Sequence, residues 1–487
     1  MLRPLLVLVR SIKSLQKCHK AFVTRANHTT AVTANGANFT LTGDDSSYLF
    51  HVDEETGELI SDHFGGPADD FVNPPLISYQ GWVCPHCLLL TLQEILTQLQ
   101  VDGLGNLRRE FPDVGRSDVR LPAIHISHAD GNTVTALTYK SHEIVQGKPG
   151  LPGLPATFGD DGDVSTIIVH LHDNISDVSA ALSYSMFPKY NAVARSFQLT
   201  NNGTEEISIE RAASFSTDLP NLDLEMIELQ GDWSYEMNRV KRPIQYGETT
   251  FRSTIGYSSH IHNPFFALVS PETTETQGEA WGFNLVYSGS FEASTERFSN
   301  GLVRVLLGLN SLHASIPVKP GDTFTSPEAV AIYSSQGVGG MSRSFHDLYR
   351  NHLSRSNYTF QARPILLNSW EGVYFDYNNA STLVDLAQET ADLGISLFVN
   401  DDGWFGEAPY ARVNDTAGLG DWTPNPDRFP NGFGNYVSNV TNLDVVNSTQ
   451  KMKFGLWFEP GKLRTSHCRL NITNDLQKWS TPIPAFT

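Results

Sequence analysis

Cysteine is scarce in this chain, which has only four in 487 residues. Cys18, Cys84, Cys87 and Cys468 are too few for a fold held together by disulfides. Cys84 and Cys87 have the spacing of half a zinc site, but the sequence has no second Cys-x-x-Cys or His-x-x-x-His pair to complete it. We therefore expect neither a bound metal nor another cofactor.

Positive charge and long apolar runs are also in short supply. Lys and Arg number 34 against 53 Asp and Glu, and the resulting net charge of −19 would repel a nucleic acid backbone. No apolar run approaches the roughly 18 residues that a membrane-spanning helix needs. The sequence also lacks a P-loop, a Gly-x-Ser-x-Gly elbow and a His-Glu-x-x-His motif. We expect no nucleic acid or membrane partner, and this balance fits a protein that handles neutral ligands.

Helical periodicity is nearly absent from residue 36 to residue 330. Short β-branched runs recur there, separated by Gly, Pro and Asn clusters; they span residues 134–139, 164–171, 180–187, 191–199, 207–215, 281–291 and 302–309. Many strands without intervening helices predict a large β-sandwich over 36–330. A helical pattern returns at Met341–Leu353, so we expect a helical linker over 331–363. Residues 1–35 are expected to be a targeting or disordered segment.

The segment from Ile395 to Gly406 carries the most chemical information. An apolar run that reads as a buried strand, Ile395–Val399, is followed by Asn400, Asp401, Asp402, Gly403 and Trp404. Carboxylates accept hydrogen bonds from sugar hydroxyls, and an aromatic face packs on the apolar side of a sugar ring. The plainer interpretation is a strand that ends in a turn with a surface Asp pair, since Asp-Gly is a common turn signal.

Two neighbouring segments favour the sugar-binding interpretation. Residues 364–372 and 453–460 are also apolar runs that end in Trp and Glu, and a helical pattern from Leu383 to Leu393 lies between the first two runs. Gly394 is placed to end that helix. Strand, helix and strand at this spacing predict a βαβ unit in a parallel sheet. The Trp and acid residues are then expected on one rim, the carboxyl-terminal face of a (β/α)8 barrel.

Several long motifs resemble those of the α-galactosidases of glycoside hydrolase family 36, most closely the secreted fungal members. The motifs are Arg108–Asp113, Gly150–Pro155, Ser258–Phe266, Gly282–Gly289, Gly340–Arg343, Asn368–Glu371, Asp401–Gly406, Leu419–Trp422 and Phe454–Pro460. The resemblance implies an N-terminal β-sandwich, a (β/α)8 barrel and retaining hydrolysis of terminal α-linked galactose from oligosaccharides and galactomannans. It also implies a homotetramer, with Asp401 and Asp402 on galactose hydroxyls and Trp370, Trp404 and Trp457 shaping the sugar pocket.

The chain departs from this family after Pro460. The family's nucleophile lies in a Lys-Trp-Asp motif, whereas the one Lys-Trp pair here, Lys478-Trp479, precedes Ser480. We therefore expect residues 364–460 to form the first three barrel strands, 461–487 to be a tail foreign to the family, and both catalytic aspartates to lie beyond the truncation. The segment from Cys84 to Gln100 also looks foreign, because it has an apolar helical face inside a region rich in predicted strands. Retained introns at 461–487 and within 84–102 would explain the two foreign stretches. A helix in a loop excursion is the alternative for the second.

Two other functions remain open at this point. One is a galactoside-binding protein without catalysis, which would keep Asp401 and Asp402 and lack the catalytic pair. The other is a galactosyl transferase related to the raffinose and stachyose synthases, which share the barrel.

Asn-x-Ser/Thr sequons are frequent and favour a secreted glycoprotein. We expect N-glycosylation at Asn38, Asn174, Asn202, Asn357, Asn379, Asn414, Asn439 and Asn447. The N-terminus fits this only in part, because the apolar run Leu5–Val9 is short and is followed by Arg10. Its basic, acid-free composition also resembles a mitochondrial transit peptide.

We predict that the purified 487-residue chain does not hydrolyse nitrophenyl α-galactoside and aggregates through its C-terminal quarter, since an unclosed barrel exposes strand edges. Release of nitrophenolate, measured by absorbance, checks the first part, and light scattering checks the second. Turnover above the buffer rate would contradict the prediction.

Overall fold

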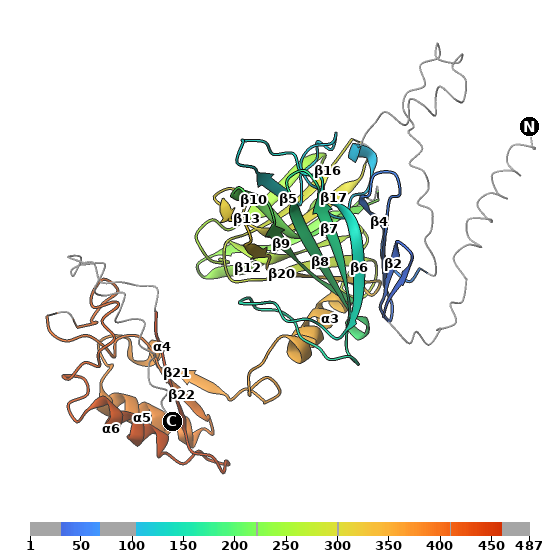
Figure 1. Ribbon diagram of the computed structural model, residues 1–487. Helices are drawn as coiled ribbons and strands as arrows, with labels where there is room; N and C mark the ends of the chain where they lie inside the picture. The colour runs from blue at the N-terminus through green and yellow to red at the C-terminus, as the bar shows by residue number, and fades with distance from the viewer. Residues whose placement is uncertain (1–30, 69–103, 221–222, 300, 410, 460–487) are drawn as a thin grey trace, which may run out of the picture. The chain divides into compact units, whose positions relative to one another are not determined.

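The computed structural model describes residues 31–68, 104–220, 223–299, 301–409 and 411–459 (Figure 1). The chain divides into two compact units, Met1–Ser356 and Asn357–Thr487. Each unit has its own hydrophobic core. The expected fold class is confirmed: an N-terminal part rich in β-sheet precedes a part in which parallel strands alternate with helices.

The first unit is built from antiparallel sheets. A four-stranded sheet has the order β1 (Val32–Asn35), β2 (Asn38–Thr42), β3 (Ser47–Val52) and β4 (Leu59–Gly65). A second sheet has the order β13 (Gly247–Arg252), β16 (Phe291–Arg297), β17 (Val303–Leu309), β10 (Ile207–Leu219) and β18 (Ile316–Val318), and β5 (Ile124–Ser127) also pairs with β10. Short 3-10 helices cover Leu104–Asn106 and Pro188–Tyr190.

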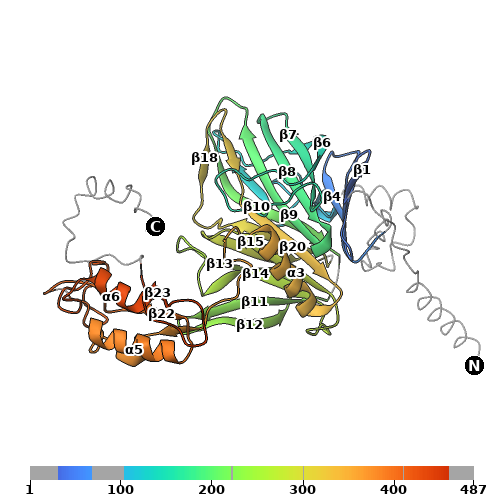
Figure 2. The ribbon, with the colours of Figure 1, turned by 90° about the horizontal axis from the view of Figure 1, so that it is seen from below.

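The largest sheet runs across the unit in ten strands. Its order is β12 (Tyr235–Pro243), β11 (Glu225–Asp232), β14 (His262–Val269), β15 (Ala280–Val286), β20 (Glu328–Ser334), β9 (Ala192–Asn201), β8 (Val178–Phe187), β7 (Ser165–Asp173) and β6 (Thr138–Gln146), and β19 (Thr323–Thr325) pairs with β9 (Figure 2). Strand β8 shows why a sheet forms here. Its residues alternate, with Ala180, Leu182 and Tyr184 buried and Ser179 and Ala181 half-exposed.

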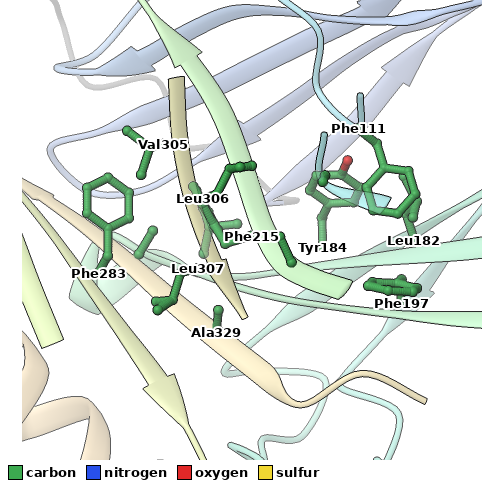
Figure 3. Packing of buried hydrophobic residues seen from close by; sticks show 14 of the residues in the cluster. Phe111, Leu182, Tyr184, Phe197, Phe215, Phe283, Val305, Leu306, Leu307 and Ala329 are labelled. Carbon is green, nitrogen blue, oxygen red and sulfur yellow. The ribbon is translucent and has the colours of Figure 1, made fainter. Parts of the chain in front are cut away.

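The buried faces of these sheets meet in one aromatic and aliphatic core. Figure 3 shows Phe215 of β10 and Leu307 of β17 close to Phe283 of β15. The rings of Phe215 and Phe283 lie 5.4 Å apart in an edge-on arrangement that aromatic pairs prefer. Burial of this core supplies the main driving force for folding of the first unit.

A buried ionic network joins the loop before β5 to the second sheet. Asp218 of β10 accepts hydrogen bonds from Arg304 Nε at 2.7 Å and Arg120 Nη1 at 3.0 Å. Asp118 contacts the same two arginines. Burial alone would raise the pKa of Asp118, but the hydrogen bond from Arg120 and the charges of Arg304 and Arg109 outweigh it and lower the pKa to about 2. Arg109 joins this network, since its backbone N donates to Asp218 Oδ2 at 3.1 Å, so the Arg108–Asp113 motif contributes to the fold of the first unit.

Helix α3 (Gly337–His352) packs against the ten-stranded sheet through Met341, Phe345 and Leu348. Gly282 of β15 makes this close approach possible, because a Cβ at that position would collide with Met341 and Phe345. The same contact explains why glycine stands in the middle of a strand, where it otherwise weakens the strand.

The second unit contains a parallel sheet with the order β21 (Leu366–Asn368), β22 (Leu397–Asn400) and β23 (Lys453–Leu456). Its described helices are α4 (Trp370–Val373), α5 (Ala380–Asp392) and α6 (Phe433–Thr441). Asn379 caps α5 by accepting a hydrogen bond from Thr382 N at 3.2 Å. Gly394 follows α5 with φ +79°, which confirms its predicted place after the helix.

Two predicted boundaries differ from the structure. Residues 331–334, expected in the helical linker, belong to β20, because Ala329–Tyr333 is a run of apolar residues buried on both faces of a sheet. Residues 32–35, expected to be disordered or targeting sequence, form β1 and pair with β2. The segments 84–102 and 461–487 lie outside the described residues.

Within the described ranges, no helix combines the length and apolar content needed to cross a membrane.

We predict that Gly282→Ala destabilises the first unit by about 1–3 kcal/mol, because the added methyl group must displace Met341 or Phe345 in a packed core. Gly162→Ala is the control, since a Cβ there has no neighbour within 4 Å, and it should change stability by less than about 0.5 kcal/mol. Urea unfolding of both variants measures the difference. Equal stability of the two variants would contradict the prediction.

Candidate active site

The predicted site residues of the second unit gather at one edge of its sheet. Because β21, β22 and β23 are parallel, their carboxyl ends lie together. Backbone hydrogen bonds continue past the strands: Ser369 N donates to Val399 O at 2.9 Å, and Trp457 N donates to Asn400 O at 3.0 Å. Asp401 and Trp457 therefore follow neighbouring strands on the same rim.

Asp401 is half-buried and has a defined carboxylate orientation. Asn368 Nδ2, at the end of β21, donates to Asp401 Oδ2 at 2.5 Å, and Asp402 N donates to Asp401 Oδ1 at 2.6 Å. Asp401 N donates to Ser369 Oγ at 3.0 Å. A carboxylate accepts about four hydrogen bonds, so Asp401 keeps acceptor capacity for a ligand.

Asp402 is held differently, by a buried ion pair. Asp402 is 6% exposed and Arg412 4%. Arg412 Nε lies 2.9 Å from Asp402 Oδ1, and Arg412 Nη2 lies 2.5 Å from Asp402 Oδ2. Arg412 Nη1 also donates to the backbone carbonyl oxygens of Asn414 and Ala417, at 2.8 and 3.1 Å. This two-point contact fixes the carboxylate plane and ties the acid-bearing turn to the loop that follows it.

The turn after the acid pair requires glycine. Gly403 has φ +98°, and a Cβ there would lie 3.1 Å from Asn378 Nδ2 and 3.2 Å from Arg428 Nη1. Asn378 Nδ2 donates to Asp402 O at 2.6 Å. Burial lowers the pKa of Arg428, against the opposing charges of Asp376 and Asp402. The backbone of the acid pair is therefore held from the side of the loop as well as from the sheet.

Two half-buried indole rings follow the strands on either side of the strand that carries the acid pair. Trp370 lies edge-on to Phe375, with ring centres 4.9 Å apart. Trp457 contacts Trp422, with ring centres 6.1 Å apart. Half-buried indole rings beside carboxylates can pack against a sugar ring while the acids accept its hydroxyl protons.

Trp404 is a correction to the predicted set. It is 2% exposed and lies in the core of the second unit, so it has no free face for a sugar. Its Nε1 donates to Trp457 O at 3.0 Å. The physical reason is packing: the indole ring of Trp404 contacts the rings of Phe405 and Phe433, with ring centres 5.2 and 5.5 Å apart.

Sequence reasoning did not single out three residues of this arrangement: Asn368, Arg412 and Trp422. Asn368 and Trp422 lie inside the motifs shared with the family. The position of Asn368 at the end of a predicted strand could have indicated that it lies next to the acid pair. Arg412 lies in an irregular loop, where no periodicity predicts its partner. Among the described residues, no three His, Cys, Asp or Glu side chains gather as they would around a metal ion.

The expected glycosylation sites are accessible with one exception. Asn38, Asn174, Asn202, Asn357, Asn414, Asn439 and Asn447 are exposed. Asn379 is half-buried, and its side chain caps α5.

Known protein families match most of the chain. The Glycosyl hydrolase family 36 N-terminal domain matches residues 58–319, and Melibiase matches residues 323–471. The second match runs past Pro460, so residues 461–471, predicted to be foreign to the family, belong to the matched region.

Alpha-galactosidases are among the similar proteins. Alpha-galactosidase 2 from Hypocrea jecorina is 55% identical over 431 residues, covering 88% of this chain and 55% of that protein. The GH36 alpha-galactosidase AgaB from Geobacillus stearothermophilus has a TM-score of 0.78 at 37% identity, covering 88% of this chain and 57% of that one. A variant of AgaA from the same bacterium, crystallised with raffinose, has a TM-score of 0.76 at 36% identity and covers 87% and 56%. The chain thus spans about half the length of these relatives.

We predict that Arg412→Met destabilises the second unit by about 3–5 kcal/mol, because it leaves Asp402 buried without its partner. Lys451→Met is the matched control, since Lys451 pairs with Asp444 at the surface, and it should cost less than about 1 kcal/mol. Urea unfolding followed by tryptophan fluorescence measures both. Equal losses in the two variants would show that the Asp402–Arg412 pair does not hold the turn.

Proposed function

The chain belongs to glycoside hydrolase family 36. We propose that the protein functions as an α-galactosidase. The reaction is hydrolysis of terminal, non-reducing α-D-galactose with retention of configuration. The observation that carries the proposal is the oriented, half-buried Asp401 carboxylate, which Asn368 of the neighbouring strand holds at the rim. Trp370 and Trp457 follow the two neighbouring strands to the same rim.

The residues of the second unit would bind and orient the sugar. Asp401 accepts hydrogen bonds from galactose hydroxyls through its remaining lone pairs. The family resemblance also places Asp402 on a galactose hydroxyl, and in this chain its oxygens already accept from Arg412 and from Gly403 N. Trp370 and Trp457 pack against the apolar side of the ring. Fixing the sugar in this way aligns its anomeric carbon with catalytic groups, which lowers the entropic part of the barrier.

The covalent step requires two further carboxylates. In retaining glycosidases a nucleophile and an acid/base lie roughly 5 Å apart on either side of the scissile bond. By resemblance the nucleophile belongs to a Lys-Trp-Asp motif, which the 487 residues do not contain. A second candidate function is binding of galactosides without turnover, which the orientation of the Asp401 carboxylate by Asn368 would also serve.

The proposed substrates are neutral galactose oligosaccharides and galactomannans. Support comes from the AgaA variants crystallised with raffinose and with stachyose, both α-galactosides. The surplus of acidic residues in this chain, with a net charge of −19, also suits an uncharged substrate better than an anionic one.

Secretion, N-glycosylation and assembly into a homotetramer extend the proposal. Exposed sequon asparagines in both units support glycosylation, which takes place in the secretory pathway. The tetramer rests on the family resemblance alone.

We predict that the chain binds galactose and that Asp401→Asn weakens this binding roughly 10- to 100-fold, the effect of losing a charged hydrogen-bond acceptor. Asp385→Asn, an exposed acid on α5, is the control and should leave the dissociation constant unchanged. Isothermal titration with galactose, and with glucose as the epimer that misplaces one hydroxyl, measures the affinities. Equal affinity of the wild type and Asp401→Asn would overturn the proposed site.

A further inference from the structure

The first unit carries a polar hollow that the proposed activity does not use. It has a volume of about 450 Å³, within the range of small-molecule sites, and lies on strands β6 to β9. Its lining includes Lys140, His170, His172, Gln198 and Thr200. Figure 1 shows β6, β7, β8 and β9 side by side in the ten-stranded sheet.

Side-chain size explains why this face is hollow. The outward residues of the central strand β8 are small, Ser179 and Ala181. Across the sheet they stand next to His172 and His170 of β7 and next to Thr200 and Gln198 of β9. Small residues along one strand, with larger polar residues on both neighbouring strands, make a trough along β8.

The trough offers hydrogen-bonding groups suited to hydroxyls and amides. His172 Nδ1 lies 3.1 Å from Ser179 Oγ, and Thr200 Oγ1 lies 2.9 Å from Thr323 Oγ1. The side chains of His170 and His172 are 41% and 26% exposed. Imidazole, amide and hydroxyl groups both donate and accept, which matches a neutral, polyhydroxylated ligand.

Two sequons stand at one end of this trough. Asn174 lies in the turn between β7 and β8 and is itself a lining residue, with Lys140 Nζ 3.1 Å from its Oδ1. Asn202 follows β9, and its Nδ2 donates to Ser179 Oγ at 2.8 Å. Val178 pairs with Asn201, so both sequons sit beside the start of β8.

We propose that the N-linked glycan of Asn174 folds back into this trough and that its first sugars occupy the hollow. This inference rests on the proposed passage through the secretory pathway and is independent of the proposed hydrolysis. The ligand is the N-acetylglucosamine of the chain's own glycan, whose hydroxyls and acetamide meet the imidazoles and Gln198.

The covalent attachment of the glycan to Asn174 favours it over a free saccharide as the ligand of the trough. An exposed polar trough binds a free sugar weakly, because each contact competes with water. A sugar fixed to Asn174 has an effective concentration in the millimolar range, which occupies about half or more of a site of millimolar affinity without any free ligand. The bound glycan would cover β7 and β8 and shield the two histidines.

Carbethoxylation of histidine, followed by peptide mass spectrometry on native protein from a glycosylating host, tests the inference. We expect Asn174 to be glycosylated and His170 and His172 to react roughly two- to tenfold more slowly than in Asn174→Gln or Ser176→Ala, which both remove the sequon. His313, an exposed histidine outside the trough lining, should react equally in all three proteins.

A second variant tests the trough itself. Ala181→Phe fills the hollow with a side chain that strands tolerate, so an endoglycosidase should release the Asn174 glycan severalfold faster than from the wild type. Val119→Phe, at a residue 79% exposed, is the control and should release it at the wild-type rate.

Three results would overturn the inference. Equal histidine reactivity with and without the sequon would refute it, as would glycosylation of other sequons with Asn174 bare. Absence of glycans from every sequon of the secreted protein would refute both the glycosylation proposal and this inference. None of these outcomes bears on galactose binding.

Discussion

The proposed chemistry depends on one constraint, the parallel pairing of β21, β22 and β23. Parallel strands bring their carboxyl ends to a single edge, and the hydrogen bonds of Ser369 N and Trp457 N extend that pairing beyond the strands. Asp401 and Trp457 meet at one rim for this reason. Because β21 and β22 are neighbours, Asn368 at the end of β21 can donate a hydrogen bond to Asp401, and this bond fixes the orientation of the carboxylate. A slip of one residue in the register would turn these side chains to the other face of the sheet.

The two adjacent acids are held in different electrostatic environments. Asp402 is buried and has its own cation, Arg412, so its charge is compensated within the protein. Asp401 is half-buried and bound by neutral donors, which leaves its charge available to polarise ligand hydroxyls. The first unit uses the same device for stability, where Asp218 is buried against Arg304 and Arg120. In both units a buried carboxylate is paired with arginine. The planar guanidinium group presents several N–H donors in a fixed arrangement, which the ammonium group of lysine could not reproduce.

The local sequence pattern predicted most of the helices and strands, but it did not predict which side chains contact one another across the fold. The alternation in β8, the helical spacing of Leu383 and Ala387, and Gly394 after α5 are short-range signals that survive in the fold. The boundary between the β-sandwich and the helical linker, predicted at residue 331, falls inside β20, because a run buried on both faces has no period of two that would mark its end. Arg412 could not be found from the sequence, since its contact with Asp402 depends on how an irregular loop closes. The burial of Trp404 could not be found from the sequence, because an aromatic residue after a strand can face either the rim or the core, and its packing on Phe405 and Phe433 depends on tertiary structure.

A crystal structure of the chain soaked with galactose tests the central claim most directly. We expect a galactose hydroxyl within about 3.2 Å of the Asp401 carboxylate, with the sugar ring against Trp370 or Trp457 and the Asp402–Arg412 pair intact. A galactose bound elsewhere, or an Asp401 that faces only solvent while the sugar occupies another surface, would contradict it.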